Sequence, residues 1–364
     1  MLSRERFKVM FLGTFILVLL VGLAYLSSPV TATPGPEKMF RVAFSPENLA
    51  SPYWRTCLAG AERAVKDINN QYGRVVLEMD SVEYRDDPSL QMDHISAIIG
   101  TKERYSFYSA PAVVEEATVE PLRRLYEAGI PAFLWDRDTA PEGRKYRKTC
   151  IITNNVEVGK MEVQYLMEAL RKTDKPKPYK IVCAWGHPGA SSAEDRKEGS
   201  LMALRPLVDA GEVEIVSEQS HEGWSRSKAL DFIATVLARG RLDAVVSSND
   251  DMALGAIAAV KAAGLTPGRD VFIAGVDAIE EAQGAIKAGE MVVSIAQANY
   301  AMAYWSILAG FQHVAFGWEA PMSIIPAPVM PVTAANVVGF TLEVPLMDKW
   351  SEYGMTLEEL PKKL

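Results

Sequence analysis

The sequence predicts an α/β protein built from two doubly wound parallel-sheet lobes. Short runs rich in β-branched and aromatic residues alternate with helix-period segments over most of the 364 residues, and this alternation is typical of parallel sheets covered by helices on both faces. Ten strand-like runs are more than one sheet comfortably holds. Polar side chains recur where these runs end, which is where open α/β sheets bind ligands.

The predicted strands are short apolar runs bounded by polar or turn-forming residues. They cover 40–44, 75–79, 105–109, 130–136, 150–153, 180–185, 213–216, 244–247, 271–276 and 291–296. The segments between them have helical periodicity. Leu58, Ala61, Val65 and Ile68, for example, are spaced three and four apart, and this spacing places one apolar stripe against a sheet.

Three of the predicted helices end on a glycine that directly follows an alanine. These glycines are Gly129, Gly264 and Gly289. Glycine adopts the left-handed conformation that stops a helix at little cost, so we expect each to lie just beyond a helix end.

The N-terminal segment differs in composition from the rest of the chain. Three basic residues precede an apolar run over 9–26, and small residues follow as far as Ala32. This order predicts a secretory signal over 1–32, cleaved after Ala32, and hence a periplasmic location. An uncleaved membrane anchor is the alternative, because the apolar run approaches the roughly 20 residues that span a bilayer.

Charge and cysteine content exclude several classes of protein. The formal net charge is −8 and there is no basic block, so we expect no nucleic-acid partner. Cys57, Cys150 and Cys183 are an odd number, which leaves at least one unpaired, and their apolar surroundings predict buried, inert thiols. The four histidines are scattered without metal-ligand spacing, so we expect no metal and no cofactor.

Polar and aromatic side chains gather after the predicted strands. A ligand with many hydroxyl groups requires planar donors and acceptors, and its C–H faces pack on aromatic rings. The sequence therefore predicts a sugar site. The candidates at strand ends are Ser51, Tyr53, Trp54, Asp136, Arg137, Trp224, Asn249, Asp277 and Gln297.

From about Phe40 to Val332 the chain resembles the type I periplasmic sugar-binding proteins, which are related to ribose-binding protein and to the ligand domains of LacI-type repressors. The motifs that carry the resemblance are Ser-Asn-Asp-Asp-Met-Ala-Leu-Gly-Ala over 248–256, Ala-Gly-Val-Asp over 274–277, Ile-Ala-Gln over 295–297, Ile-Pro-Ala at 130–132 leading to Asp136, and Ser-Ala-Glu-Asp-Arg-Lys-Glu-Gly over 192–199.

The resemblance implies a role for each candidate, and it adds one more residue, Arg196. Asp136 and Arg137 would bind ligand hydroxyls from the first lobe. Ser51 stands where ribose-binding protein has a longer amide side chain. From the second lobe or its hinge edge, the hydroxyl-binding residues would be Arg196, Asn249, Asp277 and Gln297, and the sugar ring would pack on Tyr53 and Trp54 with Trp224 on the opposing side.

The resemblance also implies three chain crossings between the lobes, near 137–150, 297–299 and 326–332. The first lobe would comprise 38–137 plus 299–326. The second would comprise 150–297 plus 327–364. The final segment, 333–364, extends beyond the pattern, and we expect it to pack against the second lobe.

Taken singly, each candidate has another interpretation. The alternatives are a surface ion pair for Asp136 and Arg137, helix caps for Asn249-Asp250 and for Asp277, and core packing for Trp54 and Trp224. For the helix beginning near 251, we expect Asp250 or Asp251 to be the cap.

These observations predict an exported, monomeric, non-enzymatic receptor that closes on a sugar and presents it to the membrane permease of an ABC transporter. A receptor that reports to a membrane sensor or chemoreceptor is the alternative. A carbohydrate-active enzyme is disfavoured because nucleophile-elbow, P-loop and dinucleotide motifs are lacking. A repressor would require a helix-turn-helix where the export signal stands. Pentose, hexose, polyol and furanose-like ligands all suit this set of residues.

Overall fold

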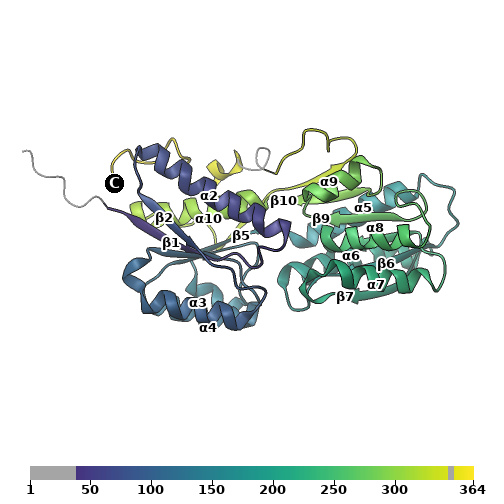
Figure 1. The fold of residues 1–364 in the computed structure, drawn as a ribbon, viewed down its shortest axis with the longest axis horizontal. Coiled ribbons are helices and arrows are strands. Elements are labelled where there is room, and N and C mark those ends of the chain that lie inside the picture. The colour runs from purple at the N-terminus through teal and green to yellow at the C-terminus, as the bar shows by residue number, and fades with distance from the viewer. Residues whose placement is uncertain (1–37, 343–347) are drawn as a thin grey trace, which may run out of the picture. The chain divides into compact units, whose positions relative to one another are not determined.

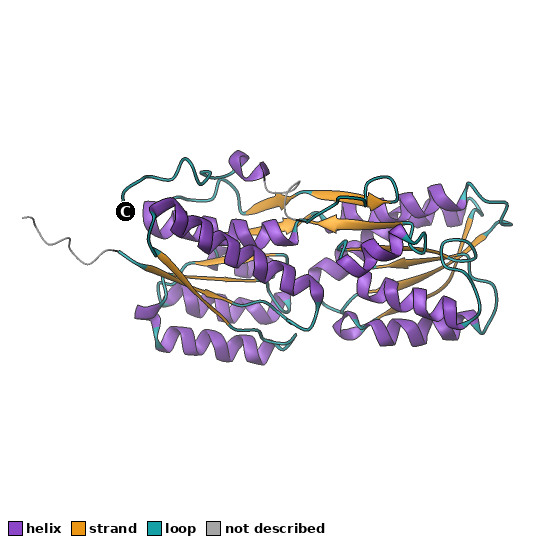
Figure 2. Ribbon diagram, turned by 45° about the horizontal axis from the view of Figure 1, so that its top comes forward, coloured by secondary structure: helices purple, strands orange, loops and turns teal. Residues whose placement is uncertain are grey.

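Two six-stranded sheets form the framework of the protein in the computed structural model (Figure 1, Figure 2). The structure describes residues 38–342 and 348–364, and the description below concerns the unit formed by 39–364. The predicted export signal, 1–32, lies outside the described residues. Within the described ranges, no helix is long and apolar enough to cross a membrane.

The first sheet is parallel throughout and has the strand order β11-β5-β4-β3-β1-β2. Its strands are β1 (Phe40–Phe44), β2 (Leu77–Ser81), β3 (Phe107–Ala110), β4 (Ala132–Trp135), β5 (Thr149–Thr153) and β11 (Ile324–Ala327). One face is covered by α2 (Pro52–Tyr72) and α10 (Asn299–Phe316), and the other by α3 (Pro88–Gly100) and α4 (Glu115–Glu127) (Figure 1). The short helices η1 (Lys102–Arg104) and η2 (Pro141–Tyr146) lie in connections. We call this sheet with its helices the first lobe.

The second sheet has the order β12-β10-β9-β8-β6-β7, and only its edge strand β12 is antiparallel to its neighbour. Its strands are β6 (Tyr179–Trp185), β7 (Val213–Ser220), β8 (Ala244–Ser247), β9 (Phe272–Val276), β10 (Val293–Gln297) and β12 (Val329–Thr333). The helices are α5 (Asn155–Leu170) and α6 (Ser191–Asp209) on one face, and α7 (Arg226–Leu237), α8 (Asp250–Ala262) and α9 (Glu280–Lys287) on the other. The one-turn helix η3 (Glu222–Trp224) follows β7. This sheet with its helices is the second lobe.

Successive residues of the strands enter separate cores, as the two-residue period of a strand requires. In β8, Val245 packs with α7, α8 and α9, whereas Ala244 and Val246 pack with α5. Both faces of each sheet are therefore buried, which explains why the strands are apolar runs without polar alternation.

The predicted fold class is confirmed, and each of the ten predicted strands overlaps an observed one. The sequence analysis missed β11 and β12. Each contains a proline, Pro326 or Pro331, and each lies at the edge of its sheet. Proline cannot donate a ladder hydrogen bond and is tolerated mainly at edges, so it obscured both strands in the sequence.

The predicted helix ends are also confirmed. Gly129, Gly264 and Gly289 follow α4, α8 and α9 with φ angles of 78°, 76° and 73°. These values lie in the left-handed region that favours glycine.

The predicted start of the second lobe at residue 150 is wrong. It falls inside β5, whose hydrogen bonds to β4 and β11 place it in the first sheet. The chain passes between the lobes only after Thr153, before α5 begins at Asn155. An apolar run identifies a strand, but pairing decides which sheet the strand joins, and the sequence does not reveal that pairing.

The final segment contacts both lobes, so its predicted packing on the second lobe alone is wrong. Val337 and Phe340 pack in the second lobe. Trp350, however, lies against Trp305 and Trp318, with ring centroids 5.7 and 5.9 Å apart, in the core formed by α2 and α10. These aromatic contacts between residues distant in sequence fix the end of the chain on the first lobe.

The three cysteines are free and buried, as predicted. Burial raises the pKa of each thiol well above its ordinary value. Since the thiolate is the reactive form, all three thiols are inert.

Candidate functional site

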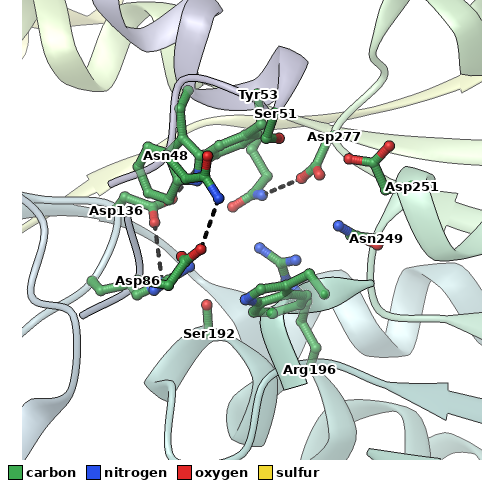
Figure 3. Close-up of a pocket in the computed structure, with 15 residues that line it drawn as sticks. Asn48, Ser51, Tyr53, Asp86, Asp136, Ser192, Arg196, Asn249, Asp251 and Asp277 are labelled. Atoms are coloured by element: carbon green, nitrogen blue, oxygen red, sulfur yellow. Dashed lines mark hydrogen bonds and ion pairs between the residues drawn. The ribbon is translucent and has the colours of Figure 1, made fainter. Parts of the chain in front are cut away.

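A polar pocket lies where the carboxyl ends of strands from both sheets come together (Figure 3). Its cavity volume is about 70 Å³. All ten candidate residues from the sequence line it. The lining residues are Asn48, Ser51, Tyr53, Trp54, Asp86, Asp136, Arg137, Ser192, Arg196, Gly223, Trp224, Asn249, Asp251, Asp277 and Gln297.

Five lining residues were not predicted. Asn48, Ser192, Gly223 and Asp251 lie within or beside segments that the sequence had already marked. Asp86 had no such signal: it belongs to the loop after β2, where Arg85 and Asp86 both have positive φ angles, of 51° and 60°. Only the folded chain brings this loop to the pocket, where Asp86 accepts a hydrogen bond of 2.9 Å from Asn48 Nδ2.

Asp136 and Arg137 follow β4 and are buried, with 4% and 5% exposed. The surface ion pair considered from the sequence is therefore wrong. Asp136 has a φ of 64° and accepts a hydrogen bond from the Tyr53 hydroxyl. Burial raises the pKa of the Asp136 carboxyl above its ordinary value, although Arg137 and the Tyr53 hydroxyl oppose the shift.

Glu47, a buried carboxylate that the sequence analysis missed, forms an ion pair with Arg137 on the side away from the pocket. Arg137 Nη1 donates to Glu47 Oε1 at 2.6 Å, and the Glu47 side chain is 2% exposed. Burial raises the pKa of Glu47 well above its ordinary value, with Arg137 opposing. Glu47 does not line the pocket, so its contribution is to orient the guanidinium that does.

The aromatic residues of the first lobe join the pocket to the core. Tyr53 and Trp54 meet edge to face, with ring centroids 5.0 Å apart. Trp54 also contacts Trp135, which stacks on Phe44 at 5.4 Å. Core packing and pocket lining are therefore not alternatives for Trp54, because its ring does both.

Arg196 is fixed in the second lobe by neutral acceptors. It lies near the start of α6 and is 3% exposed. Its Nε donates to Asn155 Oδ1 at 2.8 Å, and its Nη1 donates to the Ser248 carbonyl at 2.7 Å. Guanidinium carries five N–H donors, so donors remain for a ligand after these two bonds.

Asn249 has the helix-capping role that was considered for it and lines the pocket as well. Its Oδ1 accepts from Met252 N at 2.9 Å at the start of α8. The expectation that Asp250 or Asp251 caps this helix is wrong, because Asp250 accepts from Ser294 Oγ and Ile279 N, at 2.7 and 3.0 Å, and Asp251 accepts from Arg226 Nη2 at 2.7 Å. The cap occupies the Asn249 oxygen, which leaves its amide NH₂ as a donor.

Asp277 and Gln297 form a hydrogen-bonded pair, with Gln297 Nε2 donating to Asp277 Oδ1 at 2.7 Å. The helix-cap interpretation of Asp277 is wrong, because α9 is preceded by Ile279 and has no side-chain cap. Burial raises the pKa of Asp277, and Arg196 opposes the shift. The Asp277 backbone has a φ of 116°, unusual for a residue other than glycine.

Trp224 is the aromatic residue of the second lobe, and it is only partly buried. Arg137 lies over its ring at 5.7 Å from the centroid, and Arg196 at 5.5 Å. Arg137 also lies 5.4 Å from the Trp54 centroid. Indoles and guanidinium groups thus alternate across the pocket, an arrangement favoured by cation–π attraction.

The pocket combines fixed donors, fixed acceptors and exposed indole surface. Its two arginines and its amides can donate to hydroxyl oxygens, and its carboxylates can accept from hydroxyl hydrogens. Among the described residues, no group of three His, Cys, Asp or Glu side chains is arranged to hold a metal ion. This chemistry suits a small ligand with several hydroxyl groups.

A family model described as a periplasmic binding protein domain matches residues 42–317. The chain is 32% identical over 231 residues to a putative rhizopine-binding protein of Rhizobium meliloti, covering 62% of this chain and 70% of that protein. It is 28% identical over 259 residues to a ribose import binding protein of Haemophilus influenzae, covering 70% and 79%. The match to the galactofuranose-binding protein of Escherichia coli is 32% over 178 residues, 48% of this chain and about half (54%) of that protein.

Solved structures share the fold. A galactofuranose binding protein superposes with a TM-score of 0.71 at 23% identity, covering 82% of this chain and 96% of that one. An ABC transporter solute binding protein from Bacillus halodurans with bound myo-inositol superposes with a TM-score of 0.70 at 23% identity, covering 84% and 98%.

Proposed function

Because the chain belongs to the periplasmic binding protein family, we propose that it binds a small polyhydroxylated ligand, a sugar, in the pocket between its two lobes and delivers it to an ABC transporter. The observation that carries this proposal is the pocket itself. Asp136 and Arg137 from the first lobe and Arg196, Asn249 and Asp277 from the second all line one volume.

The bonding of these groups supports a hydroxyl-rich ligand. Each side chain is fixed by a partner within the protein, yet the set retains both donors and acceptors. Hydroxyl groups match such a mixture because each can donate and accept. The indoles of Trp54 and Trp224 provide apolar surface for the C–H faces of a sugar ring.

The relatives support the same class of ligand. Their names refer to galactofuranose, ribose and D-allose, and one structure of the same fold has bound myo-inositol. These molecules have in common a compact skeleton that carries several hydroxyl groups. We propose that the ligand of this protein has the same character.

A transport role requires that the protein be exported and that it bind a membrane partner. We propose that the segment 1–32 directs export to the periplasm, where the protein acts as a monomer and docks on the permease of an ABC transporter. Names of relatives that refer to import support this role. In this proposal the protein binds its ligand and releases it without chemical change.

Thermal unfolding with a panel of pentoses, hexoses, furanoses and cyclic polyols tests the proposal. A ligand that binds only the native state stabilises it by RT ln(1 + [L]/Kd), about 2.7 kcal/mol at 100 times Kd. We expect a subset of the panel to raise the midpoint. Absence of any shift, or turnover of a panel member to a product, would contradict the proposal.

Calorimetry on a matched pair of variants then assigns the binding to this pocket. Asp136→Ala removes an acceptor that lines the pocket, and we expect it to weaken binding of the selected sugar about tenfold or more. Asp209→Ala alters an exposed aspartate at the end of α6 and serves as the control. Equal affinities for the two variants would place the sugar elsewhere.

A further inference from the structure

Trp224 is presented to the pocket by a turn whose backbone is unfavourable without support. Gly223 and Trp224 follow one another with φ angles of 69° and 53°. Glycine adopts this left-handed conformation readily, but a residue with a bulky side chain does not. Contacts from outside the turn must therefore hold Trp224 in place.

His187 supplies one of these contacts. The Gly223 backbone N–H donates to His187 Nδ1 at 2.9 Å. His187 belongs to the loop after β6, whereas the turn follows β7, so the bond joins the ends of neighbouring parallel strands. The turn is also tied by Trp224 N donating to the His221 carbonyl at 3.1 Å.

Gly186, next to His187, supplies the space for the indole. A Cβ atom added to Gly186 would lie 2.2 Å from Cζ3 and 2.4 Å from Cη2 of Trp224. The indole therefore rests directly on the Gly186 backbone. Any side chain at this position would push the ring toward the pocket or out of it.

We propose that His187 is a positioning residue, because its neutral imidazole holds the turn that presents Trp224 to the ligand. Protonation of His187 then loosens this turn and lowers ligand affinity in acid. This inference rests on the proposed function, in which Trp224 contacts the bound sugar. An imidazole accepts a hydrogen bond through Nδ1 only when that nitrogen carries no proton, which requires the Nε2–H tautomer. An imidazolium would direct an N–H at the Gly223 N–H, and the bond would be lost.

The surroundings of His187 favour the neutral form. Burial lowers its pKa below the ordinary 6.5, and the cationic Arg137 lowers it further. The charges of Asp86, Glu222 and Lys228 also act on the imidazole: the two carboxylates raise its pKa and the lysine lowers it. Because the pKa is lowered in the folded protein, the contact is intact at neutral pH and is lost as pH falls below about 6.5 through the folded value.

Nuclear magnetic resonance of the ligand-free protein tests the hydrogen bond without any sugar. We expect the imidazole nitrogens of His187, assigned by their disappearance in His187→Asn, to report the Nε2–H tautomer at pH 8 with Nδ1 unprotonated. A proton on Nδ1 at pH 8 would overturn the proposal. This measurement remains decisive even if the protein binds no sugar, so failure here and failure of the proposed function are distinguishable.

The effect on affinity is measured by calorimetry at several pH values with a sugar selected from the panel. In His187→Asn the amide oxygen replaces Nδ1 as acceptor and is not protonated between pH 5 and 8. The variant should therefore bind the sugar like wild type at pH 8. His187→Ala removes the acceptor and should bind about fivefold more weakly than His187→Asn at every pH, the worth of one hydrogen bond. The ratio of wild-type affinity to His187→Asn affinity should decrease as the pH is lowered from 7.5 to 5. Taking this ratio cancels the contribution of carboxyl groups that both proteins share.

Two controls complete the design. His94→Asn changes a histidine on α3 in the first lobe and should retain the wild-type pH profile. Gly186→Ala should weaken binding at every pH by displacing the indole, whereas Gly284→Ala, with open space around the added methyl group, should not. Wild-type affinity in His187→Ala at pH 8, or a ratio of wild-type to His187→Asn affinity that does not vary with pH, would overturn the proposal.

Discussion

The two walls of the pocket are built differently. On the first lobe, Trp54 packs against Trp135 in the core, and Arg137 is anchored by the buried Glu47. On the second lobe, Trp224 is partly exposed and stands on a turn held by backbone hydrogen bonds and His187. The first wall is therefore preorganised by the same packing that folds the lobe, whereas the second can change without disturbing a core.

The largest expected difference between the walls is in stability. Trp54→Ala should lower the free energy of unfolding by about 3–5 kcal/mol, because it opens a cavity in the first core. Trp224→Ala should lower it by less than about 1 kcal/mol, because the indole is partly exposed. Urea unfolding of the two variants measures both values, and similar losses would show that the walls are built alike.

Glu47→Gln tests the anchor of the first wall. The change keeps a hydrogen-bond acceptor for Arg137 but removes the charge, so it should destabilise the protein by about 2 kcal/mol and weaken sugar binding. Glu142→Gln, on the exposed face of η2, is a control. If Glu47→Gln unfolds at the wild-type urea concentration, the ion pair does not hold this wall.

Trp224→Phe sharpens the comparison from the second wall. We expect an affinity loss of only a few-fold, worth about 0.5–1.5 kcal/mol of aromatic contact. We propose that the lobes close on the sugar and remove Trp224 from water, so the saturable change in tryptophan fluorescence on sugar binding should diminish in this variant. An undiminished signal in a variant that still binds sugar would show that the ligand does not reach Trp224.

The smallest expected effect concerns Asp277. Burial raises its pKa, so the folded protein binds a proton more readily than the unfolded chain, and stability falls as pH rises above the ordinary 3.8 through the folded value. Relative to Asp277→Asn, the ligand-free wild type should therefore lose stability between pH 5 and 8. Thermal unfolding of both proteins at pH 5 and at pH 8 measures this change in stability. A wild type that gains stability relative to Asp277→Asn as pH rises would contradict the prediction.

Nine of the residues that line the pocket could be predicted from the sequence because strand ends are local features, and Arg196 was added by the family resemblance. Asp136, Asn249 and Asp277 each follow an apolar run directly, and parallel strands bring such positions to one edge of a sheet. Glu47 and Asp86 follow the first two strands, but nothing in the local sequence shows that Glu47 pairs with Arg137 or that Asp86 reaches the pocket. Their positions depend on how the loops after β1 and β2 fold against each other, joined by the Arg85 N–H that donates to the Glu47 carbonyl at 2.6 Å.

The sequence by itself determined the α/β class, the ten strands it predicted and the helix stops at Gly129, Gly264 and Gly289, since periodicity and glycine conformation act over a few residues. Tertiary structure alone decided which sheet β5 joins and where the chain end packs. It also decided that Glu47 stands behind Arg137 and that Trp224 rests on Gly186. The physical reason is that strand pairing and side-chain packing depend on contacts between residues far apart in the chain. The pattern of a few neighbouring residues does not specify these contacts.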